Sequence, residues 1–100
     1  MSGRDTSGAI VWIGQSAPPT PEARAVYHAI VELGLTTVDE VASAVAEALF
    51  AGDAAGFGWT ADLGFFRRWY LADALRVLRR LDGTSVRITR ARERAAGTAG

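Results

Sequence analysis

The sequence predicts a mainly α-helical domain with a small β element, and three observations support that prediction. Three stretches carry apolar residues at helical spacing and are bounded by capping residues or glycines. Two short stretches, residues 9–13 and 85–90, have the composition or the alternation of strands. The chain has 100 residues, of which 49% are hydrophobic, and this is enough for one modest core.

We expect a single folded domain over residues 9–90, because both ends of the chain lack core-forming residues. Residues 1–8 predict a disordered N-terminus, and residues 91–100 predict a flexible C-terminal tail. No apolar run approaches the roughly 20 residues that span a membrane, and the run at 9–13 is shorter than the core of a signal peptide. The chain also has no cysteine, and we therefore expect a cytoplasmic protein.

The first element is the apolar run Ala9–Ile13, whose β-branched and aromatic residues are typical of a strand. Pro18 and Pro19 then interrupt regular structure. The first helix follows, with Thr20 as its N-cap, Pro21 at its first position and Gly34 as its C-terminal stop.

The second helix begins with a capping box, in which Thr37 and Glu40 satisfy backbone amides of the first turn. We expect Gly52 to end this helix and a glycine-rich loop to follow it. Phe57 and Trp59 lie in that loop, and leaving them in water is unfavourable, so we expect them to fold back onto the core. An exposed contact surface is the alternative.

The third helix is expected to start at Asp62 or Phe65, to run to Leu81 and to stop at Gly83. A helical wheel places its apolar residues on one side: Leu63, Phe66, Tyr70, Leu71, Ala74, Val77, Leu78 and Leu81. The opposite side holds Arg68, Trp69, Arg76, Arg79 and Arg80 together with Phe65 and Ala72, and Asp73 is the acid among them. Arg67 falls inside the apolar arc, so the helix begins near it or its stem covers apolar surface.

Charge divides the chain into two halves, although its formal net charge is zero. Residues 1–62 contain two arginines against eight acids, and residues 63–100 contain nine arginines against three acids. Such a division indicates that the basic half meets an anion, with duplex DNA as the first candidate. The alternative is that the two halves complement each other within the fold or between copies of the chain.

Four segments, taken in order, resemble the winged helix-turn-helix family: TPEA at 20–23, TVDEVASAV at 37–45, LRVLRRLDG at 75–83 and SVRITR at 85–90. The resemblance implies a three-helix winged helix-turn-helix-like domain that binds DNA in transcriptional or mobile-element regulation. It places Arg68 and Trp69 at the DNA groove, Arg76, Arg79 and Arg80 near phosphates, and Arg87 and Arg90 in the wing.

The chain departs from that family at two places. The gap from Gly52 to Asp62 is longer than the family's turn of about three or four residues. A wing also needs two strands, and after the third helix the sequence predicts one, at 85–90. Residues 9–13 can supply the second strand by pairing with 85–90, or they can pair with a second copy of the chain and form a dimer.

A non-enzymatic protein-interaction or assembly module is the alternative function. Its contacts would come from the N-terminal strand and the aromatic loop, namely Ile10, Val11, Trp12, Ile13, Phe57 and Trp59, and its basic half would dock on an acidic protein partner. We expect no enzyme, cofactor or metal, because His28 is the only histidine and no cluster of His, Asp and Glu has ligand spacing.

Overall fold

The computed structural model describes residues 8–14, 18, 20–58 and 63–89, and they form helices with a small antiparallel sheet. The order along the chain is β1 (Ala9–Trp12), α1 (Pro21–Tyr27), the π-helical segment η2 (His28–Glu32), α2 (Val38–Phe57), α3 (Leu63–Leu81) and β2 (Val86–Thr89). The expected fold class, mainly α with a small β element, is confirmed.

Helix α1 begins where the capping residues predict. The hydroxyl oxygen of Thr20 accepts a hydrogen bond from the backbone amide of Ala23 at 3.1 Å. The helix continues into η2, where the amide of Leu33 donates to the carbonyl of His28, five residues earlier, at 2.9 Å. Gly34 then adopts a φ of 75°, the left-handed conformation that glycine accepts without strain.

Helix α2 begins at the expected cap, but it is longer than expected. The amide of Glu40 donates to the hydroxyl oxygen of Thr37 at 3.2 Å. The prediction that Gly52 ends the helix is wrong, because α2 continues to Phe57 and ends at Gly58, which has a φ of 70°. The alanine-rich composition of residues 48–55 outweighs the cost of the two helical glycines, Gly52 and Gly56.

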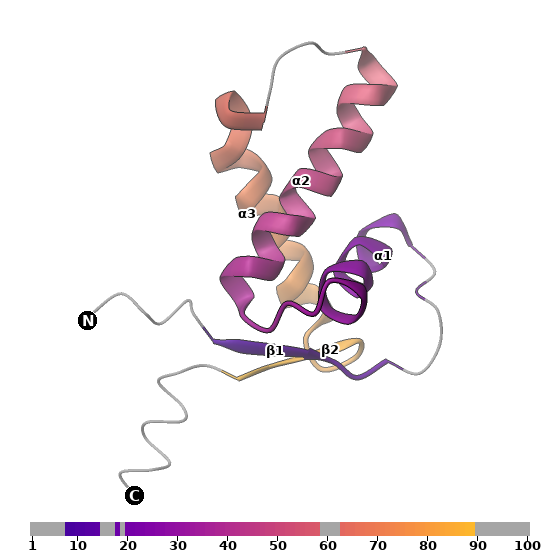
Figure 1. Ribbon diagram of the computed structural model, residues 1–100, viewed down its shortest axis with the longest axis vertical. Helices are drawn as coiled ribbons and strands as arrows, with labels where there is room; N and C mark the ends of the chain where they lie inside the picture. Colours follow the sequence, from indigo (N-terminus) through magenta and orange to yellow (C-terminus); the bar gives the residue numbers. More distant parts are fainter. Residues whose placement is uncertain (1–7, 15–17, 19, 59–62, 90–100) are drawn as a thin grey trace, which may run out of the picture.

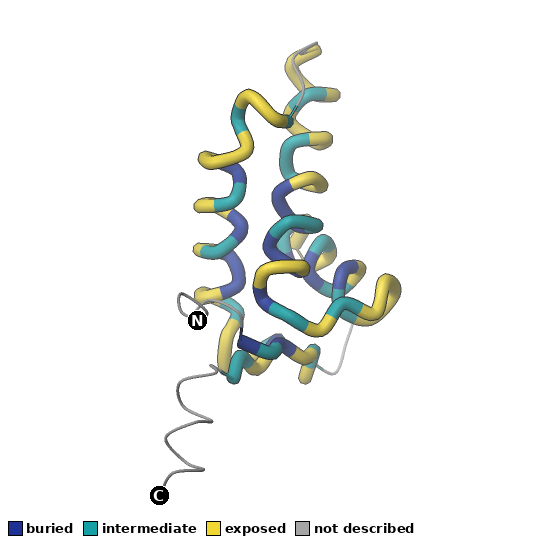
Figure 2. The backbone as a smooth tube through the Cα atoms, turned by 60° about the vertical axis from the view of Figure 1, so that its left-hand side comes forward, coloured by how far each residue is buried: buried dark blue, intermediate teal, exposed yellow. Residues whose placement is uncertain are grey.

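Helices α2 and α3 run side by side in opposite directions and rise together from the sheet, as Figures 1 and 2 show. Residues 58–62 connect them, so the connection is shorter than the gap from Gly52 that the sequence suggested. The pair forms a long helical hairpin, and α1 packs against the half of the hairpin nearer the sheet.

The sheet consists of β1 and β2 in antiparallel register, with Val11 opposite Arg87 and Ile10 opposite Ile88. The strand that pairs with β2 is therefore the N-terminal run, one of the two pairings that the sequence left open. On its other edge, β1 receives the segment before α2, where the amide of Ile10 donates to the carbonyl of Thr36 at 2.9 Å. Both edges of β1 are thus engaged within one chain.

The outer edge of β2 is covered by the turn that precedes it. The carboxylate of Asp82 accepts from the amide of Ile88 at 3.1 Å, and the amide of Gly83 donates to the carbonyl of Val86 at 2.8 Å. These bonds occupy backbone groups that would otherwise offer a template for another strand.

The core lies where the three helices meet the sheet. Its largest fully buried side chains come from every layer: Ile10, Val26, Val41, Val45, Leu78 and Val86. Figure 2 shows buried residues concentrated in the half of the hairpin near the sheet. In the distal half, the described residues 47–58 and 63–69 include no buried one. That half, which we call the hairpin tip, therefore projects from the core.

Candidate nucleic-acid interface

Helix α3 separates its apolar and basic residues as the helical wheel predicts. Tyr70, Ala74, Val77 and Leu78 are buried, and the side facing away from α2 is exposed. The exposed side carries the residues that the sequence singled out: Arg68, Trp69, Arg76, Arg79 and Arg80. The exposed Phe65 and Ala72 lie on the same side of the helix. We call the surface formed by these seven residues the α3 ridge.

The α3 ridge has the dimensions of a groove-binding helix. From Arg68 to Arg79 the rise of 1.5 Å per residue gives a length of about 16 Å. The small side chain of Ala72 lies between these two arginines and is exposed. The ridge therefore has cations near both ends and a small side chain between them.

Acids border one flank of the ridge. Arg76 forms an exposed ion pair with Asp73 at 2.9 Å, one turn away. Arg76 and Arg80 also line a groove of about 300 Å³ with Glu22 of α1 and Asp53 of α2. The acidic half of the chain therefore approaches this flank, as the alternative interpretation of the charges expected. An exposed pair contributes only about 0–1 kcal/mol, so both arginines stay available to a stronger anion.

Tyr70 connects the groove to the core. Its hydroxyl donates a hydrogen bond to the Asp53 carboxylate at 2.7 Å, and its ring packs edge-on against Phe50 with centroids 5.5 Å apart. The hydrogen bond to Asp53, together with burial and the negative charge of that carboxylate, raises the pKa of Tyr70 to about 12. This bond joins α3 to α2 near the start of the hairpin tip.

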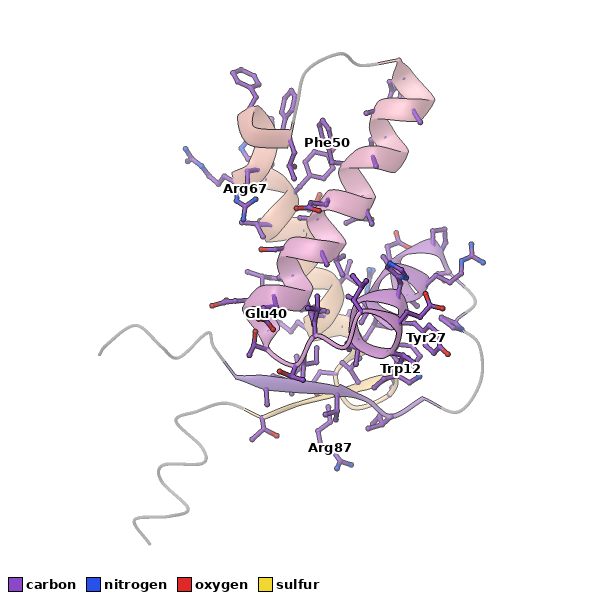
Figure 3. All side chains as sticks on the ribbon, viewed as in Figure 1. Trp12, Tyr27, Glu40, Phe50, Arg67 and Arg87 are labelled. Atoms are coloured by element: carbon purple, nitrogen blue, oxygen red, sulfur yellow. The ribbon has the colours of Figure 1, made fainter. Side chains whose placement is uncertain are left out.

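Arg67 lies beside α2 and is exposed. Its guanidinium donates to the hydroxyl of Ser43 at 3.4 Å, and Figure 3 shows the side chain on the outside of the hairpin. The sequence left two explanations for an arginine in the apolar arc. The helix starts at Leu63, well before Arg67, so the explanation by a late helix start is wrong.

Arg87 of β2 lies at the opposite end of the molecule from the hairpin tip. Arg87 is exposed, and Figure 3 shows it pointing away from the helices, below the sheet. Arg90, which the resemblance also placed in the wing, lies outside the described residues. The structure thus presents two basic areas, the α3 ridge and the outer face of β2.

The residues expected to form a protein interface are divided by the fold. Ile10 is buried, and Trp12 packs against the core with its ring edge-on to Tyr27 at 5.2 Å. Val11 and Ile13 are the exposed members of the strand segment. The prediction that Phe57 folds back onto the core is wrong, since its side chain is 72% exposed at the end of α2. Trp59 lies outside the described residues.

Phe65 is the aromatic member of the ridge that sequence reasoning did not select as a site residue. It is 81% exposed and its ring packs edge-on against Phe66 with centroids 4.9 Å apart. The signal was present, because the helical wheel places Phe65 among the arginines, on the side opposite the apolar arc. An apolar residue in that position is a candidate contact and not a core residue.

Other kinds of site find no support in the part of the chain that the structure describes. No group of three or more His, Asp or Glu side chains is placed to hold a metal ion there, and His28 contacts Glu32 on the exposed side of η2. Among the same residues, no helix has the length and apolarity needed to cross a bilayer.

Comparisons of the chain with models of protein families, with curated proteins and with solved structures gave no match.

Proposed function

We propose that this protein binds duplex DNA through the α3 ridge, with the outer face of β2 as a second contact, and that it serves transcriptional or mobile-element regulation. One observation carries the proposal. The exposed side of α3 holds four arginines, and Asp73 is the acid among them. A solvated helix face normally mixes both signs of charge, whereas a face that binds phosphates carries mainly positive charge.

The proposed docking follows from the shape of the ridge. Arg68 and Arg79, about 16 Å apart along the axis, would contact phosphates on the two sides of a groove. Ala72 lets the helix backbone approach the bases, and Arg76 and Arg80 would exchange their acidic neighbours for phosphates. The winged helix-turn-helix resemblance supports this use of the third helix, and the pairing of β2 with β1 supports the assignment of Arg87 to a wing.

A protein-interaction function is the second candidate, and the exposed Val11, Ile13 and Phe57 favour it. Dimerisation by pairing of the N-terminal strand would require β1 to release one of its two neighbours, because both of its edges are engaged. An acidic partner would instead dock on the same ridge that we assign to DNA, so a test of the ridge with DNA discriminates between the candidates.

The test removes arginines from the ridge and measures binding of a labelled random-sequence duplex as a function of salt. Each phosphate contact contributes about −0.9 to the slope of log K against log salt. The double variant Arg68→Ala/Arg79→Ala should therefore have a slope shallower by about 1.8 than that of the wild type. The fold should survive, because both side chains are exposed.

Arg24→Ala is the control, because Arg24 is an exposed arginine on α1, away from the ridge. It lowers the net charge of the protein without removing a proposed phosphate contact, so its slope should equal that of the wild type. A double variant whose slope matches the control would exclude the α3 ridge as the binding surface.

A further inference from the structure

The hairpin tip carries two aromatic side chains of the α3 ridge to which the docking described above assigns no phosphate contact. Phe65 is 81% exposed and Trp69 is 68% exposed. They lie four residues apart on α3, which places them on the same face of the helix, and Arg68 lies between them in sequence. Large aromatic side chains gain free energy on burial, so a pair left in water indicates a surface that something else covers.

These two rings are held in place by a series of ring contacts that leads back to the core. Tyr70 packs against Phe50 at 5.5 Å, and Phe50 contacts Phe66 with centroids 6.3 Å apart. Phe66 in turn contacts Phe65 at 4.9 Å and Trp69 at 6.1 Å. Figure 3 shows Phe50 between the two helices, where it supports this arrangement. A ring in a fixed orientation loses less entropy when a planar ligand stacks on it.

The charge around the rings selects an anionic ligand. From Leu63 to Ala72 the helix contains two arginines and no acid, and Asp73, one turn beyond Trp69, is paired with Arg76. The rings are also continuous with the α3 ridge, because Ala72 and Arg76 follow on the same side of the helix. Flat aromatic surfaces beside arginines are how proteins bind unpaired nucleotides, with the base stacked on the ring and the phosphate on the cation.

We propose that Trp69 and Phe65 form a stacking platform for unpaired bases next to the duplex, so that the preferred ligand is DNA with a single-stranded overhang or a locally opened segment. This inference rests on the proposed DNA-binding function and specifies its substrate. The ridge holds the phosphates of the duplex, and the tip receives the first unpaired bases beyond it.

Three forms of one labelled duplex test the platform: blunt-ended, with a six-nucleotide overhang, and with an overhang of the same length that lacks bases. Stacking of a base on an aromatic side chain corresponds to about 5- to 150-fold in affinity. The wild type should bind the overhang form tighter than the abasic form by a factor in this range. The abasic form controls for the added phosphates, since it carries the same charge.

Trp69→Ala should remove the preference for the overhang over the abasic form, and it should weaken binding of the overhang form by a larger factor than binding of the blunt duplex. Trp69→Phe should retain part of the preference, because a smaller ring still stacks. Val31→Ala is the control, since Val31 is a 48% exposed apolar residue on η2. A 2-aminopurine placed as the first unpaired base should lose fluorescence on binding the wild type and less on binding Trp69→Ala.

The outcomes separate this inference from the proposed function. Absence of binding to any of the three DNAs overturns both. Salt-dependent binding of the blunt duplex with no preference for the overhang overturns the platform alone. Loss of blunt and overhang binding by the same factor in Trp69→Ala also overturns it, because Trp69 would then act in duplex binding alone. A dimer that Trp69→Ala converts to a monomer, without any overhang preference, assigns the tip to self-association instead.

Discussion

At the scale of single residues, Tyr70 has two roles that can be measured separately. Its ring belongs to the aromatic series that supports the hairpin tip, and its hydroxyl joins α3 to α2 through Asp53. Tyr70→Phe retains the ring and removes only the hydroxyl. The variant therefore isolates the hydrogen bond from the packing.

We predict that Tyr70→Phe lowers the free energy of unfolding at neutral pH and that this difference shrinks at high pH. The hydrogen bond to Asp53 raises the pKa of Tyr70 from 10.0 to about 12 in the folded protein. A raised pKa means that the protonated hydroxyl stabilises the fold. That contribution is complete below pH 10 and is lost as the pH rises towards 12. Urea unfolding of both proteins at pH 8 and pH 11 measures it.

A constant difference between the two proteins from pH 8 to pH 11 would mean that the Tyr70 hydroxyl titrates normally and that its bond to Asp53 is not maintained in solution. Tyr27, the other tyrosine of the chain, is present in both proteins, so its ionisation does not enter the comparison.

The arginines of the α3 ridge could be predicted from the sequence, but the residues of α1 and α2 that lie beside them could not. Helical periodicity alone placed Arg68, Arg76, Arg79 and Arg80 on one side, because a long amphipathic helix has a regular geometry. Glu22 and Asp53 border this side because of the way α1 and α2 pack against α3. No local sequence pattern predicts that packing. The same applies to the contact of Arg67 with Ser43, which are 24 residues apart.

At the scale of elements, the starts of the helices were predictable and the end of α2 was not. Thr20 and Thr37 cap α1 and α2 through side-chain bonds that are local in sequence. The C-terminal signal was ambiguous, because Gly52, Gly56 and Gly58 all follow the apolar stripe and any of them can adopt a left-handed conformation. The structure uses Gly58, where φ is 70°.

A matched pair of substitutions tests this reading of α2. Gly52 lies inside the helix, and a Cβ added there meets nothing within 4 Å. Gly52→Ala should therefore raise the free energy of unfolding by about 0.5–1 kcal/mol, through helix propensity. Gly58→Ala should lower it by about 1–2 kcal/mol, because alanine is strained at a positive φ. Thermal or urea unfolding of both variants provides the measurement.

The signs of the two changes in the free energy of unfolding show which glycine ends α2. A destabilised Gly52→Ala together with a neutral Gly58→Ala would place the end of the helix at Gly52, as the sequence alone suggested. The aromatic residues of the hairpin tip would then belong to a loop, and the stacking platform would lose its support.

At the scale of the whole molecule, the acidic and basic halves of the sequence are only partly separated in space. The basic residues gather on α3 and β2, but Glu22 and Asp53 reach one flank of the ridge. The other flank, with Arg68 and Arg79, faces away from α2 and α1. The protein therefore balances its net charge at zero and still presents one basic surface of extended shape.

The hairpin gives that surface its length. Helix α3 extends beyond the core by the whole of the hairpin tip, so the ridge continues from the sheet end of the molecule to the exposed aromatic residues. A short helix-turn-helix would end the ridge near the core. The length of α2 was not predictable from the glycine-rich sequence that follows Gly52, whereas the predicted third helix, from Asp62 or Phe65 to Leu81, agrees with the observed Leu63–Leu81.

The measurement that tests the central claim most directly is fluorescence anisotropy of a labelled random-sequence duplex with the wild-type protein at about 50 mM and 200 mM salt. With four or five phosphates contacted by the arginines of α3 and β2, the affinity should fall by roughly 150- to 500-fold between the two conditions. Micromolar binding at the lower salt with a loss of this size supports the α3 ridge as a phosphate-binding surface. No binding at the lower salt would contradict the DNA-binding account and would assign the arginines to an acidic protein partner or to contacts within the protein.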